Sequence, residues 1–267
     1  MYAGKYMNMY GLPADGGVKH VPAGWDQWYG QVRLTPSVKC MQPIIVFVLS
    51  KVGNSKFYNY TLSVNGTEEK HGDNYEDDYH TDIIHNRSLT FLETRDQERP
   101  FLMVLAPPAS HAPFTPAPQY ENMFSGLTAP RLPSFNVNSG NTKHWFTRQG
   151  GNLSDAAVAE VDSVFRNRWR TLLSVDDMVE GLVTKLEEQG LLNNTYILYT
   201  SDHGYHLGEF ALPIDKRQPY EFDIRVPFIL RGPGVSANTT SDDPVLMVDV
   251  APTLFDIAGK YDGRPSN

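Results

Sequence analysis

The sequence of 267 residues contains a single cysteine, Cys40, so the chain cannot form an internal disulfide. Cysteine usage alone therefore favours a reducing compartment. No apolar run exceeds six residues, as in Ile44–Leu49, whereas a membrane-spanning helix needs roughly 20. The residues after Met1 lack the apolar stretch and cleavage site of a signal peptide. We expect neither a transmembrane segment nor a signal peptide in this chain.

Tandem repeats and long runs of like charge are also absent from the sequence. The formal net charge of −8 disfavours nonspecific binding to nucleic acid or to an anionic membrane. An acidic surface can still surround a small basic pocket, so an anionic substrate is not excluded. The hydrophobic share of 40% and the aromatic share of 12% are sufficient for a packed core.

Glycosylation signals, in contrast, are abundant. The acceptor pattern N-x-[ST] occurs six times, and a glycan requires an exposed asparagine in a protein that passes through the secretory pathway. We weigh this frequency above the cysteine count and expect a secretory or lysosomal glycoprotein. The six acceptors are Asn59, Asn65, Asn86, Asn152, Asn193 and Asn238.

Short apolar runs alternate with stretches of helical periodicity along the chain. This alternation predicts an α/β fold in which helices flank a mixed, mostly parallel sheet. Ligands bind beyond the carboxyl ends of strands in such sheets, so the residues after Ala106 and Thr200 are the first candidates. We expect strands over 57–64, 101–106, 196–200, 226–230 and 244–250, helices over 81–92, 154–189 and 253–258, and a loop over 1–30.

Local signals refine three of these elements. Asn65-Gly66 is a hairpin turn signal directly after the first expected strand. The helix over 154–189 is unusually long, so we expect a break near 168–174, and Gly190 is placed to end it as a C′ residue. Pro252 is expected in the first turn of the last helix.

One segment, 32–51, interrupts two stretches of sequence that otherwise look continuous. Val32-Arg33 can be encoded by a splice-donor-like sequence, and Ile44–Leu49 by a pyrimidine-rich tract. We hypothesise that this segment is a translated retained intron, inserted into an otherwise continuous domain. The alternative is an ordinary edge strand in an insertion.

Three positions could carry chemistry on their residue type and place alone. Asp202 follows a buried strand and could bind a divalent cation, or could cap a loop. His203 could bind a metal or hydrogen-bond an anion, or could be a packed histidine. His111 lies in a proline-stiffened loop after another strand and could bind an anion or protonate a leaving oxygen.

Two lysines could bind an anion. Lys216, in Asp215-Lys216-Arg217, could place a positive charge on a sulfate or phosphate, although an exposed basic pair is the commoner case. Lys5, after Gly4, carries less information when taken alone.

The order of these motifs resembles the type I sulfatases of the alkaline phosphatase superfamily. Gly-Lys comes first, followed by Pro-x-x-x-His-x-Pro, Ser-Asp-His-Gly, and Asp-Lys-Arg before Arg-Val-Pro. Stretches such as AGKYMNMYG, RNRWRTLLSVDD, NNTYILYTSDHGYH and LPIDKRQPYEFDIRVP are similar to the N-acetylglucosamine-6-sulfatases within that family. The similarity covers nearly the whole chain apart from 32–51.

The resemblance implies an alkaline-phosphatase-like fold and hydrolysis of a sulfate ester, with 6-sulfated glucosamine in heparan or keratan sulfate as substrate. It implies that a formylglycine, produced by the formylglycine-generating enzyme from a cysteine in C-x-P-S-R, attacks the sulfur. It also implies one Ca²⁺ that polarises the sulfate. The matching residues are Asp202 and His203 as metal ligands, Lys5 and Lys216 on the sulfate, and His111 beside the bridging oxygen.

The sequence departs from that family pattern in three places. It contains no C-x-P-S-R, since Cys40 is followed by Met-Gln-Pro-Ile. The family's N-terminal Asp-Asp pair, which supplies two metal ligands and is expected upstream of Gly4-Lys5, is also absent, and His203 stands where the similar enzymes have Asn. We therefore expect a partial catalytic domain, incomplete at both ends, which is inactive and binds metal weakly as this chain alone. The alternatives are a phosphodiesterase or phosphatase of the same superfamily and a non-catalytic truncated glycoprotein.

Overall fold

The computed structural model describes residues 1–6, 17–31, 44–49, 56–138, 140–142, 145 and 151–259. Within this part the chain divides into two compact units. The first contains 1–108, 177–202 and the segment from 227 onward, and the second contains 109–176 and 203–226. None of the described helices is both long and apolar enough to cross a membrane.

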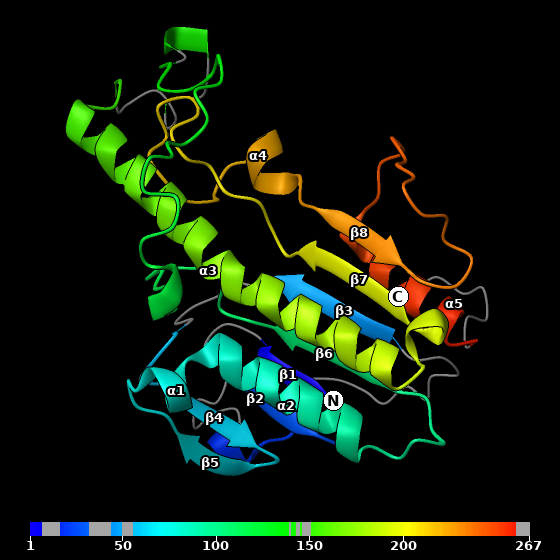
Figure 1. The fold of residues 1–267 in the computed structure, drawn as a ribbon. Coiled ribbons are helices and arrows are strands. Elements are labelled where there is room, and N and C mark those ends of the chain that lie inside the picture. The colour runs from blue at the N-terminus through cyan, green and yellow to red at the C-terminus, as the bar shows by residue number, and fades with distance from the viewer. Residues whose placement is uncertain are drawn as a thin grey trace. The chain divides into compact units, whose positions relative to one another are not determined.

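An eight-stranded sheet forms the first unit, in the order β5-β4-β2-β1-β6-β3-β7-β8 (Figure 1). The five strands from β2 to β7 in this order pair in parallel, and antiparallel strands lie at both edges. The α/β class and the mostly parallel sheet are thus confirmed. The strands are β1 (Tyr2–Lys5), β2 (Trp28–Gln31), β3 (Ile44–Leu49), β4 (Thr61–Val64), β5 (Thr67–Lys70), β6 (Leu102–Ala106), β7 (Tyr196–Ser201) and β8 (Phe228–Arg231).

Helices cover both faces of this sheet. Helix α2 and the part of α3 that belongs to the first unit lie on one face (Figure 1). Helix α5 packs on the other, where Leu254 and Ile257 lie against a cluster around Leu198. The helices are α1 (Tyr75–Asp78), α2 (His80–Thr94), α3 (Asp155–Glu188), α4 (Glu221–Ile224) and α5 (Val250–Ile257), with short 3₁₀ turns at η2 (Gly17–Lys19), η3 (Pro118–Tyr120), η4 (Gly140–Thr142), η6 (Leu192–Asn194) and η7 (Met247–Asp249).

Helix α3 follows its apolar periodicity closely. Met178, Leu182 and Leu186 recur every four residues and are fully buried. The expected break near 168–174 was wrong, because the helix is continuous from Asp155 to Glu188. Gly190, with φ of 68°, ends it as predicted. Its N–H donates to the Glu187 carbonyl and the N–H of Leu191 donates to the Leu186 carbonyl, which is a Schellman motif.

Two expectations about strands were wrong. Residues 1–30 were expected to be loop, but they contain β1 and β2. The short β1 escaped notice because it includes a glycine and a lysine, and it is held by pairing on both sides. Residues 244–250 were expected to be a strand, but they form η7 and the start of α5. Their apolar side chains, such as Val248 at 74% exposure, gain no sheet neighbour.

Other local predictions are confirmed. Asn65 and Gly66, with φ of 50° and 86°, form the turn of the β4–β5 hairpin. Strand β3 lies between β6 and β7, so the edge-strand alternative for this segment was wrong. The retained-intron hypothesis for 32–51 stays a prediction, and most of that segment lies outside the described residues.

The second unit is held together largely by side chains that contact loops. Asp162 on α3 accepts a hydrogen bond from the backbone N–H of Ala129 at 2.9 Å. Both of its carboxylate oxygens also accept from Arg131 Nη2, at 2.9 and 2.7 Å. Burial raises the pKa of the Asp162 carboxyl, but these hydrogen bonds outweigh it and the net shift is downward. A long loop is thereby fastened to the helix.

His80 allows a test of the core of the first unit. Its side chain is buried, and its Nδ1 contacts the Lys56 carbonyl at 3.1 Å. Burial lowers the pKa of His80 from 6.5 to about 4. The native state therefore resists protonation, and the stability due to neutral His80 is lost as pH falls from about 6.5 towards about 4.

We predict that His80→Asn, which keeps a donor near the Nδ1 position, reduces the loss of stability at low pH. Between pH 7.5 and pH 5, the free energy of unfolding should fall by about 2 kcal/mol less in the variant than in the wild type. Denaturant unfolding at both pH values measures this difference. A difference that does not change with pH would contradict the burial of a neutral His80.

Candidate functional site

Lys5 ends strand β1 at the carboxyl edge of the parallel sheet, although this part of the chain was expected to be loop. Its side chain is 2% exposed. The preceding Gly4 has φ of 112°, and a Cβ at this position would lie 2.1 Å from the Ala106 carbonyl oxygen. Only glycine permits β1 and β6 to approach so closely. The Gly-Lys motif thus has a structural reason for its glycine, which fixes where Lys5 leaves the sheet.

Asp202 directly follows β7 and has an exposed side chain. It lies at the same edge of the sheet as Lys5, because Lys5 ends β1, Asp202 follows β7, and these strands run in parallel. Strands β6 and β3 separate β1 from β7, so their axes are roughly 14 Å apart at the usual strand spacing.

The remaining predicted residues, His111, His203 and Lys216, belong to the second unit. His111 lies in the loop that follows β6, where its Nδ1 contacts the Ala112 carbonyl oxygen. Arg168 on α3 donates from Nη1 to the Ser110 carbonyl at 2.7 Å. The helix therefore holds the backbone one residue before His111.

Arg168 also connects this loop with the segment after β7. Its guanidinium lies 3.9 Å from the centroid of the Tyr205 ring, which in turn contacts Phe114 edge to face. Burial lowers the pKa of Arg168 to about 10, so the side chain remains charged at neutral pH. A cation–π contact and a hydrogen bond from one side chain thus fasten both loops. Sequence reasoning did not assign a role to Arg168.

Lys216 lies in a compact charged turn. The Asp215 carboxylate contacts Lys216 Nζ at 3.1 Å and Arg217 Nε at 2.7 Å. The Lys216 side chain is 16% exposed, whereas that of Arg217 is 80% exposed. Lys216 is therefore not the exposed basic residue of the alternative interpretation. His203, which directly follows Asp202, is partly buried, and its Nδ1 contacts the Gly204 carbonyl at 2.7 Å.

A buried pair that the sequence did not reveal lies beside Lys216. His206 Nδ1 contacts both carboxylate oxygens of Asp223, at 2.9 and 3.1 Å, and each residue is 4% exposed. No pattern in the sequence connects these two positions, which lie 17 residues apart. Backbone hydrogen bonds between their two segments bring the side chains together.

The described residues do not by themselves form a calcium site. Calcium takes about six to eight oxygen ligands. Within the described ranges no group of three or more His, Cys, Asp or Glu side chains is placed to hold a metal ion. Asp202 supplies one carboxylate, so the expected metal role of Asp202 and His203 stays a prediction.

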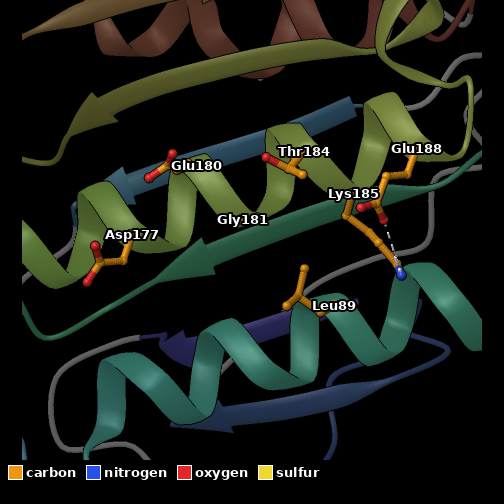
Figure 2. Close-up of a pocket in the computed structure, with 7 residues that line it drawn as sticks. All are labelled: Leu89, Asp177, Glu180, Gly181, Thr184, Lys185 and Glu188. Atoms are coloured by element: carbon orange, nitrogen blue, oxygen red, sulfur yellow. Dashed lines mark ion pairs between the residues drawn. The ribbon is translucent and has the colours of Figure 1, made fainter.

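A cavity of about 450 Å³ lies between α2 and α3 in the first unit (Figure 2). Asp177, Glu180 and Glu188 line it, and Lys185 contacts Glu188 at 3.8 Å there. Such an acidic lining would repel a sulfate group. This cavity contains none of the predicted site residues.

All six predicted glycosylation acceptors lie on the surface of the described chain. Asn65 has a second role, because its Oδ1 accepts a hydrogen bond from the Trp28 N–H at 2.7 Å. Its exposure is compatible with a glycan on Nδ2. Glycosylation at these asparagines stays a prediction.

The comparison with protein families decides the class of the protein. The Sulfatase family model matches residues 43–260. The chain belongs to the sulfatase family. The resemblance drawn from its motifs is confirmed, and the candidate residues from His111 to Lys216 fall within the matched range.

Individual sulfatases give a finer comparison. The chain is 51% identical to the human N-acetylglucosamine-6-sulfatase over 262 residues, which cover 98% of this chain and 44% of that protein. It is 43% identical to the putative extracellular sulfatase Sulf-1 homolog of Caenorhabditis elegans over 261 residues, covering 97% of this chain and 33% of that protein. The chain thus spans less than half the length of these relatives.

Solved structures show the same fold. The structure of BT4656 in complex with its substrate D-glucosamine-2-N,6-O-disulfate matches with a TM-score of 0.65 at 24% identity. The match covers 85% of this chain and 60% of the other. At this identity the similarity supports the sulfatase-type fold of the chain and not its substrate.

We predict that Gly4→Ala strongly destabilises this sulfatase domain, because the added Cβ collides with the backbone of β6. The free energy of unfolding should fall by more than about 2 kcal/mol. Gly126→Ala is the matched control, since a Cβ there meets nothing within 4 Å. It should change stability by less than about 0.5 kcal/mol. Equal unfolding midpoints for the two variants would contradict the close approach of β1 and β6.

Proposed function

We propose that the protein carrying this chain hydrolyses the 6-sulfate ester of glucosamine residues in heparan or keratan sulfate. The observation that carries the proposal is the 51% identity to an N-acetylglucosamine-6-sulfatase across 98% of the chain. The S–O bond of the ester would be cleaved, leaving the sugar hydroxyl and free sulfate.

Three side chains would act on the sulfate ester itself. Lys5 and Lys216 would bind the sulfate oxygens, and their positive charge would stabilise the charge that develops as the ester breaks. His111 would deliver a proton to the bridging oxygen, so that the sugar leaves as an alcohol. The low exposure of Lys5 and Lys216 supports these roles, because a charge in a partly desolvated position acts more strongly than one in water.

A metal ion and a modified nucleophile would complete the reaction. We propose that Ca²⁺ is bound with Asp202 and His203 among its ligands, and that the other ligands lie outside the described residues. A formylglycine, made by the formylglycine-generating enzyme, would supply the nucleophile. Since the chain of 267 residues contains no C-x-P-S-R, we propose that this chain alone is inactive.

The protein would act on its glycosaminoglycan substrate in the lysosome, as a glycoprotein of the secretory pathway. The six surface-exposed acceptor asparagines support this proposal. The relative from Caenorhabditis elegans is described as a putative extracellular sulfatase.

Substitution of one lysine tests the proposal. In the complete protein, Lys216→Met should lower kcat/KM for 6-O-sulfated N-acetylglucosamine by about 100-fold, because a positive charge on the sulfate is lost. Lys70→Met is the control. Lys70 is 76% exposed on β5, and its loss should change kcat/KM by less than about twofold.

Sulfate release followed by ion chromatography measures both variants. If the wild type released sulfate from 3-O-sulfated but not from 6-O-sulfated glucosamine, the proposed substrate would be wrong. If Lys216→Met and Lys70→Met behaved alike, the role of Lys216 would be wrong.

A further inference from the structure

We infer that the buried pair of His206 and Asp223 positions Lys216 on the sulfate of the substrate. This inference rests on the proposed function, since it deepens the role given there to Lys216. It assigns a positioning role to two residues that are distant from each other in sequence.

The pair itself has a defined geometry. His206 Nδ1 lies 2.9 and 3.1 Å from the two Asp223 oxygens, within hydrogen-bonding distance of both. Both residues are 4% exposed, so the interaction is protected from competing water. The geometry thus fixes the His206 ring in one orientation.

The same two residues hold both ends of the span that carries Lys216. The backbone N–H of His206 donates to the Asp215 carbonyl at 2.9 Å. The backbone N–H of Gln218 donates to Asp223 Oδ2 at 3.0 Å. Lys216 lies between these two anchored positions. A shift of either partner would therefore move the backbone from which the Lys216 side chain extends.

Close backbone packing fixes the pair in turn. The N–H of Gly204 donates to the Asp223 carbonyl at 2.8 Å, and that of Tyr205 donates to the Phe222 carbonyl at 2.7 Å. A Cβ on Gly204 would lie 2.0 Å from the Phe222 carbonyl oxygen, so glycine is required for this approach. The segment after β7 and the segment that precedes β8 are thereby joined around the Asp223 carboxylate.

The turn itself would be less well defined without this pair. Lys216 contacts Asp215, its own neighbour in sequence, at 3.1 Å. A contact between adjacent residues orients the side chain but does not place the turn. The hydrogen bond from the His206 N–H links this turn to the segment after β7, and the bond to Asp223 links it to α4. A displacement of about 1 Å in a group that contacts the substrate can cost about 100-fold in rate.

Two substitutions at His206 distinguish the loss of its hydrogen bond to Asp223 from a change in the size of the side chain. Asn places an amide N–H near the position of Nδ1 and can still donate to Asp223, whereas Leu has nearly the same shape and cannot. In the complete protein, His206→Leu should lower kcat/KM for 6-O-sulfated N-acetylglucosamine by about 10- to 100-fold. His206→Asn should remain within about threefold of the wild type. Equal losses in the two variants would overturn the inference.

A double-mutant cycle with Lys216 tests whether His206 affects kcat/KM through Lys216. If His206 acts through Lys216, His206→Leu should lower kcat/KM by less than about threefold once Lys216→Met is present. The shift in melting temperature from His206→Leu should be the same in both backgrounds. Losses of kcat/KM that multiply fully would mean that the pair supports the fold only. Asp223→Asn, which keeps one acceptor oxygen, serves in the same cycle if His206→Leu does not fold.

Binding of inorganic sulfate distinguishes failure of this inference from failure of the proposed function. Calorimetry should give a sulfate Kd that is weakened about 10-fold or more by His206→Leu and unchanged by His206→Asn. If the wild type binds sulfate with this pattern but releases none from 6-O-sulfated glucosamine, the substrate is wrong and the positioning role stands. If the wild type and His206→Leu bind sulfate equally, or the wild type binds none, the positioning role is wrong.

Discussion

Parallel pairing of the strands from β2 to β7 is the constraint on which the candidate site depends. Because these strands run in one direction, the residues that follow them leave from one edge of the sheet. Lys5 ends β1 and Asp202 follows β7 at this edge. The pairing of β1 with β6 in turn requires Gly4, whose missing side chain leaves room for the Ala106 carbonyl. A single steric condition therefore underlies the position of the first lysine.

The second unit depends on a different kind of interaction. Its loops are positioned by buried polar side chains, each of which serves more than one partner. Arg168 contacts both Ser110 and Tyr205, and the Asp223 carboxylate accepts from both His206 and Gln218. Such contacts are costly to leave unsatisfied, so they define a single arrangement of the loops. The sheet provides the scaffold of the first unit, whereas polar contacts hold the loops of the second unit to α3 and to one another.

Much of the fold could be predicted because its signals are local. The periodicity that ends at Gly190 and the apolar run before His111 each lie within one element, and both are confirmed. Strand β1 could not be predicted, because four residues including Gly4 form a strand only through their two neighbours. The pairing of His206 with Asp223 likewise depends on backbone contacts between distant segments. Residue types in motif order indicated the candidate site, but they could not reveal the residues that position it.

A comparison of a sulfate ester with the matching phosphate ester as substrate tests the account most directly. In one preparation of the complete protein, kcat/KM should be measured for N-acetylglucosamine 6-sulfate and for N-acetylglucosamine 6-phosphate. The sugar and the position of the ester are then identical, and only the transferred group differs. The account predicts a higher kcat/KM for the sulfate ester. A higher value for the phosphate ester would contradict it and would favour a phosphatase of the same superfamily.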